Sequence, residues 1–143
     1  MKIQFPVLTI SKSSHLNFVR NKEDLQKCNK RALKKGYHNG LIIISSDAKK
    51  YRIQGAIKQG TVGILWGFNI FRGQQLKVKL IYQKEVEDIE LNKFQNLLVK
   101  IMKRDDFFWD SDGQLKERIE FIKTGKSIKE IIVKLTDEYY KEY

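Results

Sequence analysis

Apolar and polar residues alternate with a period of two along much of the chain before residue 84, and this alternation predicts β-strands. Residues 3–10 and 16–20 are expected to form a hairpin, and Pro6 favours an edge position or a strand start for the first of them. Further strands are predicted over residues 41–46, 51–58, 62–71 and 76–82. The strands over residues 51–58 and 76–82 have one polar face, which is typical of an antiparallel sheet with one face in water.

The segment over residues 55–73 is the most apolar in the chain and contains five glycines. A strand over residues 62–71 would be apolar on both faces, which is typical of a strand covered on both sides or of a sharp bend. Glycine inside a strand indicates a bulge, a bend or the close approach of another backbone. The segment is therefore interpreted either as a curved core strand or as a groove at Gly63, Trp66 and Gly67 that admits a ligand.

One helix is predicted within this strand-rich part, over residues 21–35. Asn21 has the side chain of an N-cap, and Gly36 is placed to end the helix. Four cations would then share the outer face of the helix: Lys27, Lys30, Arg31 and Lys34. This basic stripe indicates either a surface for an acidic partner or a solvated helix face whose last lysines offset the helix dipole.

Beyond residue 84 the apolar period changes to about 3.6 residues, which predicts helices. Three helices are predicted, with apolar faces over residues 91–102, 115–122 and 128–139. An acidic group at residues 85–90 is expected to open the first helix, because carboxylates are favourable at a helix N-terminus. Ser127 and Glu130 have the spacing of a capping box for the last helix.

Three aromatic residues, Phe107, Phe108 and Trp109, lie between aspartates in the sequence DDFFWDSDG, which joins the first two of these helices. They are interpreted either as core residues or as an exposed patch for a partner protein. The aspartates do not fit a calcium loop, because the residue at the twelfth position of the loop would be Ile119 rather than glutamate. Capping of the following helix explains the aspartates better.

These elements predict a single α+β domain over residues 1–143. Its sheet is expected to be mainly antiparallel, with about five to six strands, one helix inserted early and three C-terminal helices packed on the sheet. Residues 1–83 would form the basic, sheet-rich part of this domain, and residues 84–143 the helical part. The pattern does not specify the order of the strands.

Charge is distributed unevenly between these two parts. Residues 1–83 contain 16 Lys and Arg against 3 Asp and Glu, whereas residues 84–143 contain 12 against 14, so the net charge of +11 comes from the sheet-rich part. A basic surface of this kind favours an acidic macromolecule as partner, although a lysine-rich composition alone can also produce it. Arg52, Lys77 and Lys79 lie on the polar faces of predicted strands and are expected to extend the basic surface.

Lysine outnumbers arginine by 22 to 6. Base readout and bidentate phosphate recognition favour arginine over lysine. The composition therefore argues for electrostatic attraction rather than for sequence-specific recognition of nucleic acid.

Candidate catalytic and metal-binding groups are few. His15 and His38 lie in predicted turns, and neither has a Cys or His nearby at the spacing of a zinc site. Cys28, the single cysteine, cannot form an internal disulfide and is expected to be a buried, unreactive thiol. We therefore expect no metal and no cofactor. Since the chain has neither a signal peptide nor a run of about 18 apolar residues, we also expect a cytoplasmic protein without a membrane partner.

Two functions are compatible with these patterns. The first is a non-catalytic binding protein that docks its basic N-terminal surface on an acidic macromolecule. This partner is either an acidic protein, as for a small inhibitor or immunity-type protein, or nucleic acid bound without sequence specificity. The alternative is an enzyme that acts on a small anionic or phosphorylated substrate in a groove near Trp66. The sequence contains no catalytic constellation, so no catalytic residue is assigned.

Overall fold

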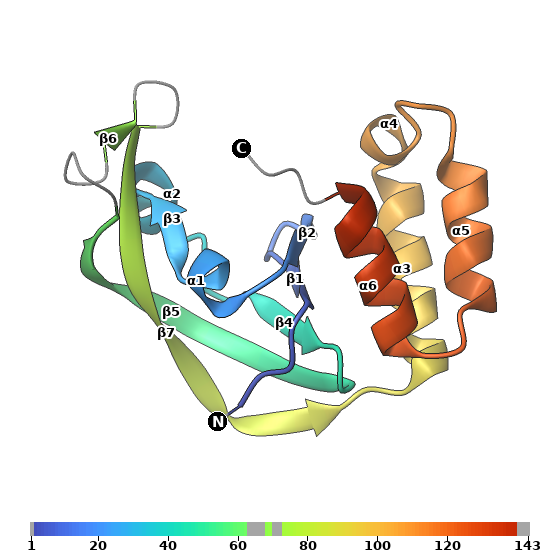
Figure 1. Ribbon diagram of the computed structural model, residues 1–143, viewed down its shortest axis with the longest axis horizontal. Helices are drawn as coiled ribbons and strands as arrows, with labels where there is room; N and C mark the ends of the chain where they lie inside the picture. Colours follow the sequence, from blue (N-terminus) through green and yellow to red (C-terminus); the bar gives the residue numbers. More distant parts are fainter. Residues whose placement is uncertain (1, 63–67, 70–72, 140–143) are drawn as a thin grey trace.

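The computed structural model describes residues 2–62, 68–69 and 73–139, which form two layers (Figure 1). One layer is an antiparallel sheet that curls into a half-barrel, and the other consists of the C-terminal helices. The expected α+β class, with a mainly antiparallel sheet and C-terminal helices packed on it, is confirmed.

In the described part of the chain, the main path of the sheet has six strands in the order β2-β1-β4-β5-β7-β3, and each neighbouring pair is antiparallel. The strands are β1 (Val7–Ile10), β2 (Leu16–Val19), β3 (Lys27–Asn29), β4 (Ile42–Ser45), β5 (Lys49–Thr61) and β7 (Gly73–Asp88). A two-residue strand, β6 (Phe68–Asn69), pairs with the start of β7. Three register shifts along the pairing of β5 with β7 bend these two long strands, as β-bulges do, and the bending curls the sheet.

β1 and β4 are buried on both faces. Val7 and Ile43 point into the half-barrel and pack in its core. Leu8 and Ile44 point to the opposite face and pack in a second core, which the C-terminal helices cover. Because side chains alternate across a strand, neighbouring residues of one short strand belong to different cores. This double burial explains why residues 41–44 form a continuous apolar run.

Four helices follow the sheet in the chain: α3 (Leu91–Arg104), α4 (Asp106–Trp109), α5 (Leu115–Thr124) and α6 (Ile128–Tyr139). The three longer helices are those that the sequence predicts, and α4 is a single turn between the first two. Phe94 and Leu98 of α3 and Ile132 of α6 are fully buried in the core between helices and sheet. The apolar stripes of these helices therefore face the sheet, as their periodicity predicts.

The turn between α5 and α6 depends on a glycine and a helix cap. A Cβ atom on Gly125 would lie 2.5 Å from Cγ1 of Ile131, so a larger residue would force the two segments apart. Ser127 Oγ accepts a hydrogen bond from Glu130 N–H at 3.1 Å, as predicted. The Glu130 carboxylate accepts one from Lys126 N–H at 3.2 Å, one residue before the expected donor.

The prediction of one continuous helix over residues 21–35 is wrong. The segment contains two short helices, α1 (Lys22–Leu25) and α2 (Lys30–Lys34), with strand β3 between them. Asn29 explains the break, because its side chain accepts a hydrogen bond from Ala32 N–H at 2.7 Å and caps a second helix. The predicted cap at Asn21 is confirmed, and so is the end of the helical segment at Gly36, where φ is +70°.

The prediction that the acidic group at residues 85–90 opens a helix holds only for Glu90, the N-cap residue of α3. Residues 85–88 belong to β7, and α3 begins only at Leu91. The Glu87 carboxylate lies 3.3 Å from Lys50 Nζ and 3.4 Å from Arg52 Nε on the adjacent strand. Hydrogen bonds and charge from Lys50, and then from Arg52, lower the pKa of Glu87. Cross-strand pairing therefore replaces the helix dipole as the partner of Glu87 and Asp88.

Most of the strand predicted over residues 62–71 lies outside the described residues. Of that range the structure describes residue 62 and the two residues of β6. Gly63, Trp66 and Gly67 lie outside the described residues, so their interpretation as a groove stays a prediction.

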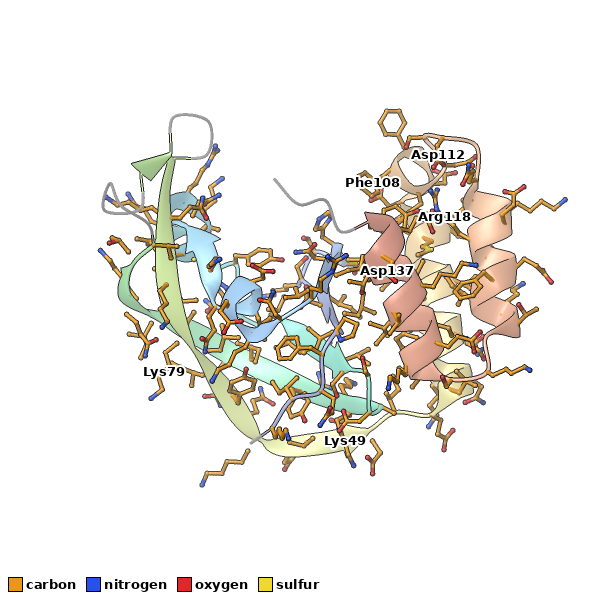
Figure 2. All side chains as sticks on the ribbon, in the orientation of Figure 1. Lys49, Lys79, Phe108, Asp112, Arg118 and Asp137 are labelled. Carbon is orange, nitrogen blue, oxygen red and sulfur yellow. The ribbon has the colours of Figure 1, made fainter. Side chains whose placement is uncertain are left out.

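A buried arginine connects α4, α5 and α6. Arg118 is 7% exposed, and its Nη1 donates hydrogen bonds to the Trp109 carbonyl oxygen at 2.7 Å and to Asp112 Oδ1 at 2.8 Å. Its Nη2 also lies 3.0 Å from Glu138 Oε1, and its guanidinium lies 4.9 Å from the ring centroid of Tyr139 (Figure 2). Because a buried guanidinium requires such partners, the arginine fixes the loop after α4 against two helices.

The Arg118–Asp112 pair predicts a change of stability at acid pH. Hydrogen bonds from Arg118 lower the pKa of Asp112 from 3.8 to about 2 in the folded state. The ionised carboxylate therefore stabilises the fold above pH 3.8, and this contribution disappears as the pH falls toward about 2. We expect thermal unfolding to show a lower Tm for Asp112→Asn than for the wild type at neutral pH, with the difference shrinking toward pH 2. Glu117→Gln, on the exposed face of α5, serves as the control, and a difference for Asp112→Asn that does not change with pH would contradict the assignment.

Candidate functional site

The structure separates the four cations of the predicted stripe. Lys27 lies on β3, whereas Lys30, Arg31 and Lys34 lie on α2, and all four side chains are exposed. A single helical face therefore does not carry them. Since α2 follows β3 directly, its cations extend the positive charge of β3 beyond the end of the sheet.

Strand pairing brings Lys27 to the lysines of β7. Lys27 and Lys77 are direct partners across β3 and β7, so their side chains project from the same face of the sheet. Lys79, two residues further along β7, projects from that face as well and points away from the body of the molecule (Figure 2). Lysines of two strands that are distant in sequence thus form a basic face, which we define by Lys27, Lys77 and Lys79.

This basic face contains few compensating acids. Lys27 Nζ lies 3.6 Å from Asp24 Oδ1. In the part of the chain that the structure describes, no carboxylate lies within ion-pair distance of Lys77 or Lys79. The positive potential of the two β7 lysines is therefore not neutralised by neighbouring side chains.

Arg52 does not belong to the basic face. It lies opposite Ile42 of β4, toward the other end of β5, and its Nε is 3.4 Å from the Glu87 carboxylate. Lys49 is paired in the same region with Asp88. The end of β7 near the helices is thus neutralised by cross-strand ion pairs, and the end near β3 is not.

Two aliphatic residues share the outer surface of β5 and β7 with the lysines. Ile57 lies opposite Lys79 and is 56% exposed, and Ile81 lies opposite Gly55 and is partly exposed. Alternation along β5 predicts a buried Ile57, and the register shifts between β5 and β7 change which β5 side chains point outward. Ile81 follows the alternation of Lys77 and Lys79 along β7, so its outward position is consistent with the polar face predicted for that strand. Exposed apolar side chains therefore lie next to Lys79 at the border of the basic face.

A hollow of about 440 Å³ adjoins the basic face between α1, β3 and the end of β5. Lys22, Lys27 and Lys77 line it together with Glu23. Lys22 is a further cation that the sequence analysis did not assign to the surface, because the single predicted helix gave it no position near β7.

The predicted aromatic patch is divided between core and surface. Trp109 is 3% exposed, and its ring packs at right angles to the rings of Phe18 and Tyr139. Phe107 is 92% exposed and Phe108 is 50% exposed. α4, which carries these residues, lies at the opposite end of the molecule from β3 (Figure 1), so the aromatic residues and the basic face do not form one site.

Cys28 and His38 are of types used in nucleophilic or acid–base catalysis, and the structure places Cys28 partly buried and His38 buried. Burial raises the pKa of the Cys28 thiol, which disfavours the reactive thiolate. Burial lowers the pKa of His38, a residue that is almost fully enclosed. Among the described residues, no group of three or more His, Cys, Asp or Glu side chains could hold a metal ion. The described helices are also too short or too polar to span a membrane.

Comparisons with known proteins do not assign a function to this surface. No protein-family model matches the chain, and neither curated protein sequences nor solved structures give a match. The function of the basic face is therefore argued from its geometry and charge.

The pairing of Lys27 with Lys77 predicts a stabilising substitution. Like charges directly opposite each other destabilise a sheet, so Lys77→Glu should raise the free energy of unfolding by about 0.2–1 kcal/mol. Urea denaturation measures the change. Lys79→Glu is the matched control, because it makes the same charge change on the same strand but has Ile57 as its cross-strand partner. An equal gain in both variants would assign the effect to net charge rather than to the lysine pair.

The division of the aromatic segment predicts two different stability effects. Trp109→Ala removes a buried ring and should lower the free energy of unfolding by about 3–5 kcal/mol. Phe107→Ala removes an exposed ring and should change it by less than about 0.5 kcal/mol. Chemical denaturation of both variants tests the assignment, which a similar loss in the two would contradict.

Proposed function

We propose that the protein is a non-catalytic binding protein that docks its basic face on an acidic protein. The observation that carries this proposal is the direct pairing of Lys27 with Lys77 on an exposed sheet face, beside Lys79. Such a pair lowers stability, and residues that lower stability are commonly retained for function. An acidic partner surface would replace the repulsion between the lysines with attraction.

Exposed aliphatic residues favour a protein partner over nucleic acid. Ile57 and Ile81 lie beside Lys79 on the outer surface of β5 and β7. Protein interfaces combine an apolar centre with a polar or charged rim, whereas proteins that bind single-stranded nucleic acid stack bases on aromatic side chains. The large apolar residues exposed on this surface are not aromatic in the part of the chain that is described. The partner surface would therefore have acidic residues around an apolar centre, and a small inhibitor or immunity-type protein is one form of this function.

The cations of α2 support the encounter with such a partner. Lys30, Arg31 and Lys34 are exposed next to the basic face. Charges at this position raise the association rate through long-range attraction, and salt screens that attraction.

Neutralisation of the basic face tests the proposal. The test variant carries three substitutions together: Lys27→Gln, Lys77→Gln and Lys79→Gln. The matched control carries the same charge change on exposed positions of α5 and α6: Lys116→Gln, Lys123→Gln and Lys129→Gln. Fluorescence anisotropy with labelled polyglutamate should show binding by the wild type that weakens as salt increases. The test variant should bind about tenfold more weakly, as expected if each lysine contributes about 0.5 kcal/mol, and the control should bind like the wild type.

Three outcomes would contradict the proposal. Absence of binding to polyglutamate at low salt would show that the basic face does not attract an acidic polypeptide. An equal loss in both triple variants would show that net charge rather than the basic face attracts the probe. Tighter binding to a polythymidine oligonucleotide than to polyglutamate would assign the surface to nucleic acid.

A further inference from the structure

One edge of β7 is open beyond the point where β3 ends. β3 pairs with β7 only at residues 75–77, and Val78 N–H then donates a hydrogen bond to the Gln26 carbonyl oxygen at 2.8 Å. β5 pairs with the other edge of β7 as far as Asp88. Within the described ranges, no strand pairs with the β3-side edge after residue 77. In the described part of the chain, the longest strand of the sheet is therefore paired along one edge and mostly unpaired with other strands along the other.

The backbone of this edge can accept another strand. In an antiparallel sheet the N–H and C=O groups of alternate residues point to the same side. Since the Val78 N–H points to the β3 side, the N–H and C=O of Leu80 point to that side as well. Unpaired strand edges bind extended peptides by adding them to the sheet.

A hollow of about 400 Å³ lies along this open edge. Leu25 of α1, Leu80 of β7 and Phe5 of the N-terminal segment contribute apolar surface to it. Its cations are Lys2, Lys22 and Lys79, and none of the described residues that line it is acidic. The hollow thus has the two properties of a peptide groove, an apolar floor and a charged rim of one sign.

We propose that the open edge of β7 binds an extended segment of an acidic protein, which adds to the sheet as a strand. Side chains of a bound strand alternate between its two faces. Those on one face would enter the hollow beside Leu25 and Leu80, with Lys22 at its rim, and those on the other would lie on the face of the sheet that carries Lys79. The segment that fits has apolar and acidic residues in alternation. This inference rests on the proposed function, because the added strand would be the segment of the acidic partner that contacts the protein.

The cations of the edge also exclude a second copy of the chain as the occupant. Two copies paired edge to edge would bring Lys22 and Lys79 of one chain close to the same lysines of the other. Charged side chains at strand edges prevent this kind of self-association. An acidic segment makes attractive pairs at the same positions.

A synthetic peptide of alternating glutamate and valine tests the proposal by amide hydrogen exchange and NMR. In the free protein, the Leu80 amide should exchange faster than those of Lys79 and Ile81, which face β5. Binding of the peptide should protect the Leu80 amide. The variant Lys22→Glu with Lys79→Glu should bind the peptide at least about tenfold more weakly, and a peptide of alternating lysine and valine should bind this variant instead. The matched control, Lys116→Glu with Lys129→Glu, should bind the glutamate peptide like the wild type.

Several outcomes would overturn strand addition. Binding of the glutamate peptide without protection of Leu80 would place it elsewhere on the basic surface and would leave the proposed function intact. Equal affinity of the wild type for the glutamate and lysine peptides would exclude charge recognition at this edge. An oligonucleotide that displaces the peptide and protects the same amide would assign the edge to nucleic acid. Failure of polyglutamate to bind would contradict the proposed function itself.

Discussion

Burial of both faces of β1 and β4 is the condition on which the rest of the structure depends. These two four-residue strands supply side chains alternately to the core of the half-barrel and to the core beneath the helices. Leu8, Ile43 and Ile44 are fully buried, and apolar burial of this kind is the main favourable contribution to folding. A substitution that creates a cavity beside either strand would therefore weaken packing in one core and disturb the strand that also supports the other core.

The same two strands determine which part of the sheet stays exposed. The helices pack on the side of β1, β2 and β4, whereas β5, β7 and β3 extend beyond them (Figure 1). Along β7, Glu87 and Asp88 are paired with cations of β5 near the helices. Toward β3, Lys77 and Lys79 have no such pairing among the described residues. β7 thus runs from a region in which its charges are paired to a region in which these lysines are not paired with acids in the described part of the chain.

Periodicity predicts the elements whose pattern continues without interruption, including the β1–β2 hairpin, α3 and α6. It is wrong at residues 21–35, because Asn21 and Asn29 are both suitable N-caps and because the partner of β3 is distant in sequence. Glu87 fits a helix start as well as a cross-strand pair, and only the position of Lys50 decides between them. The sequence proposes the same lysines for a basic surface, but Lys27 joins Lys77 through strand pairing rather than through a helical face. Local sequence does not contain that information.

The aspartates of α4 and its following loop lie at one end of the molecule, and β3 lies at the other (Figure 1). Separation of opposite charges along the long axis gives the protein an electric dipole moment. If the partner is the acidic protein proposed above, its field exerts a torque on this dipole that turns the β3 end forward before contact, over distances of about 8–10 Å at physiological salt. A larger fraction of collisions then begins in the docking orientation, without any additional contact in the complex.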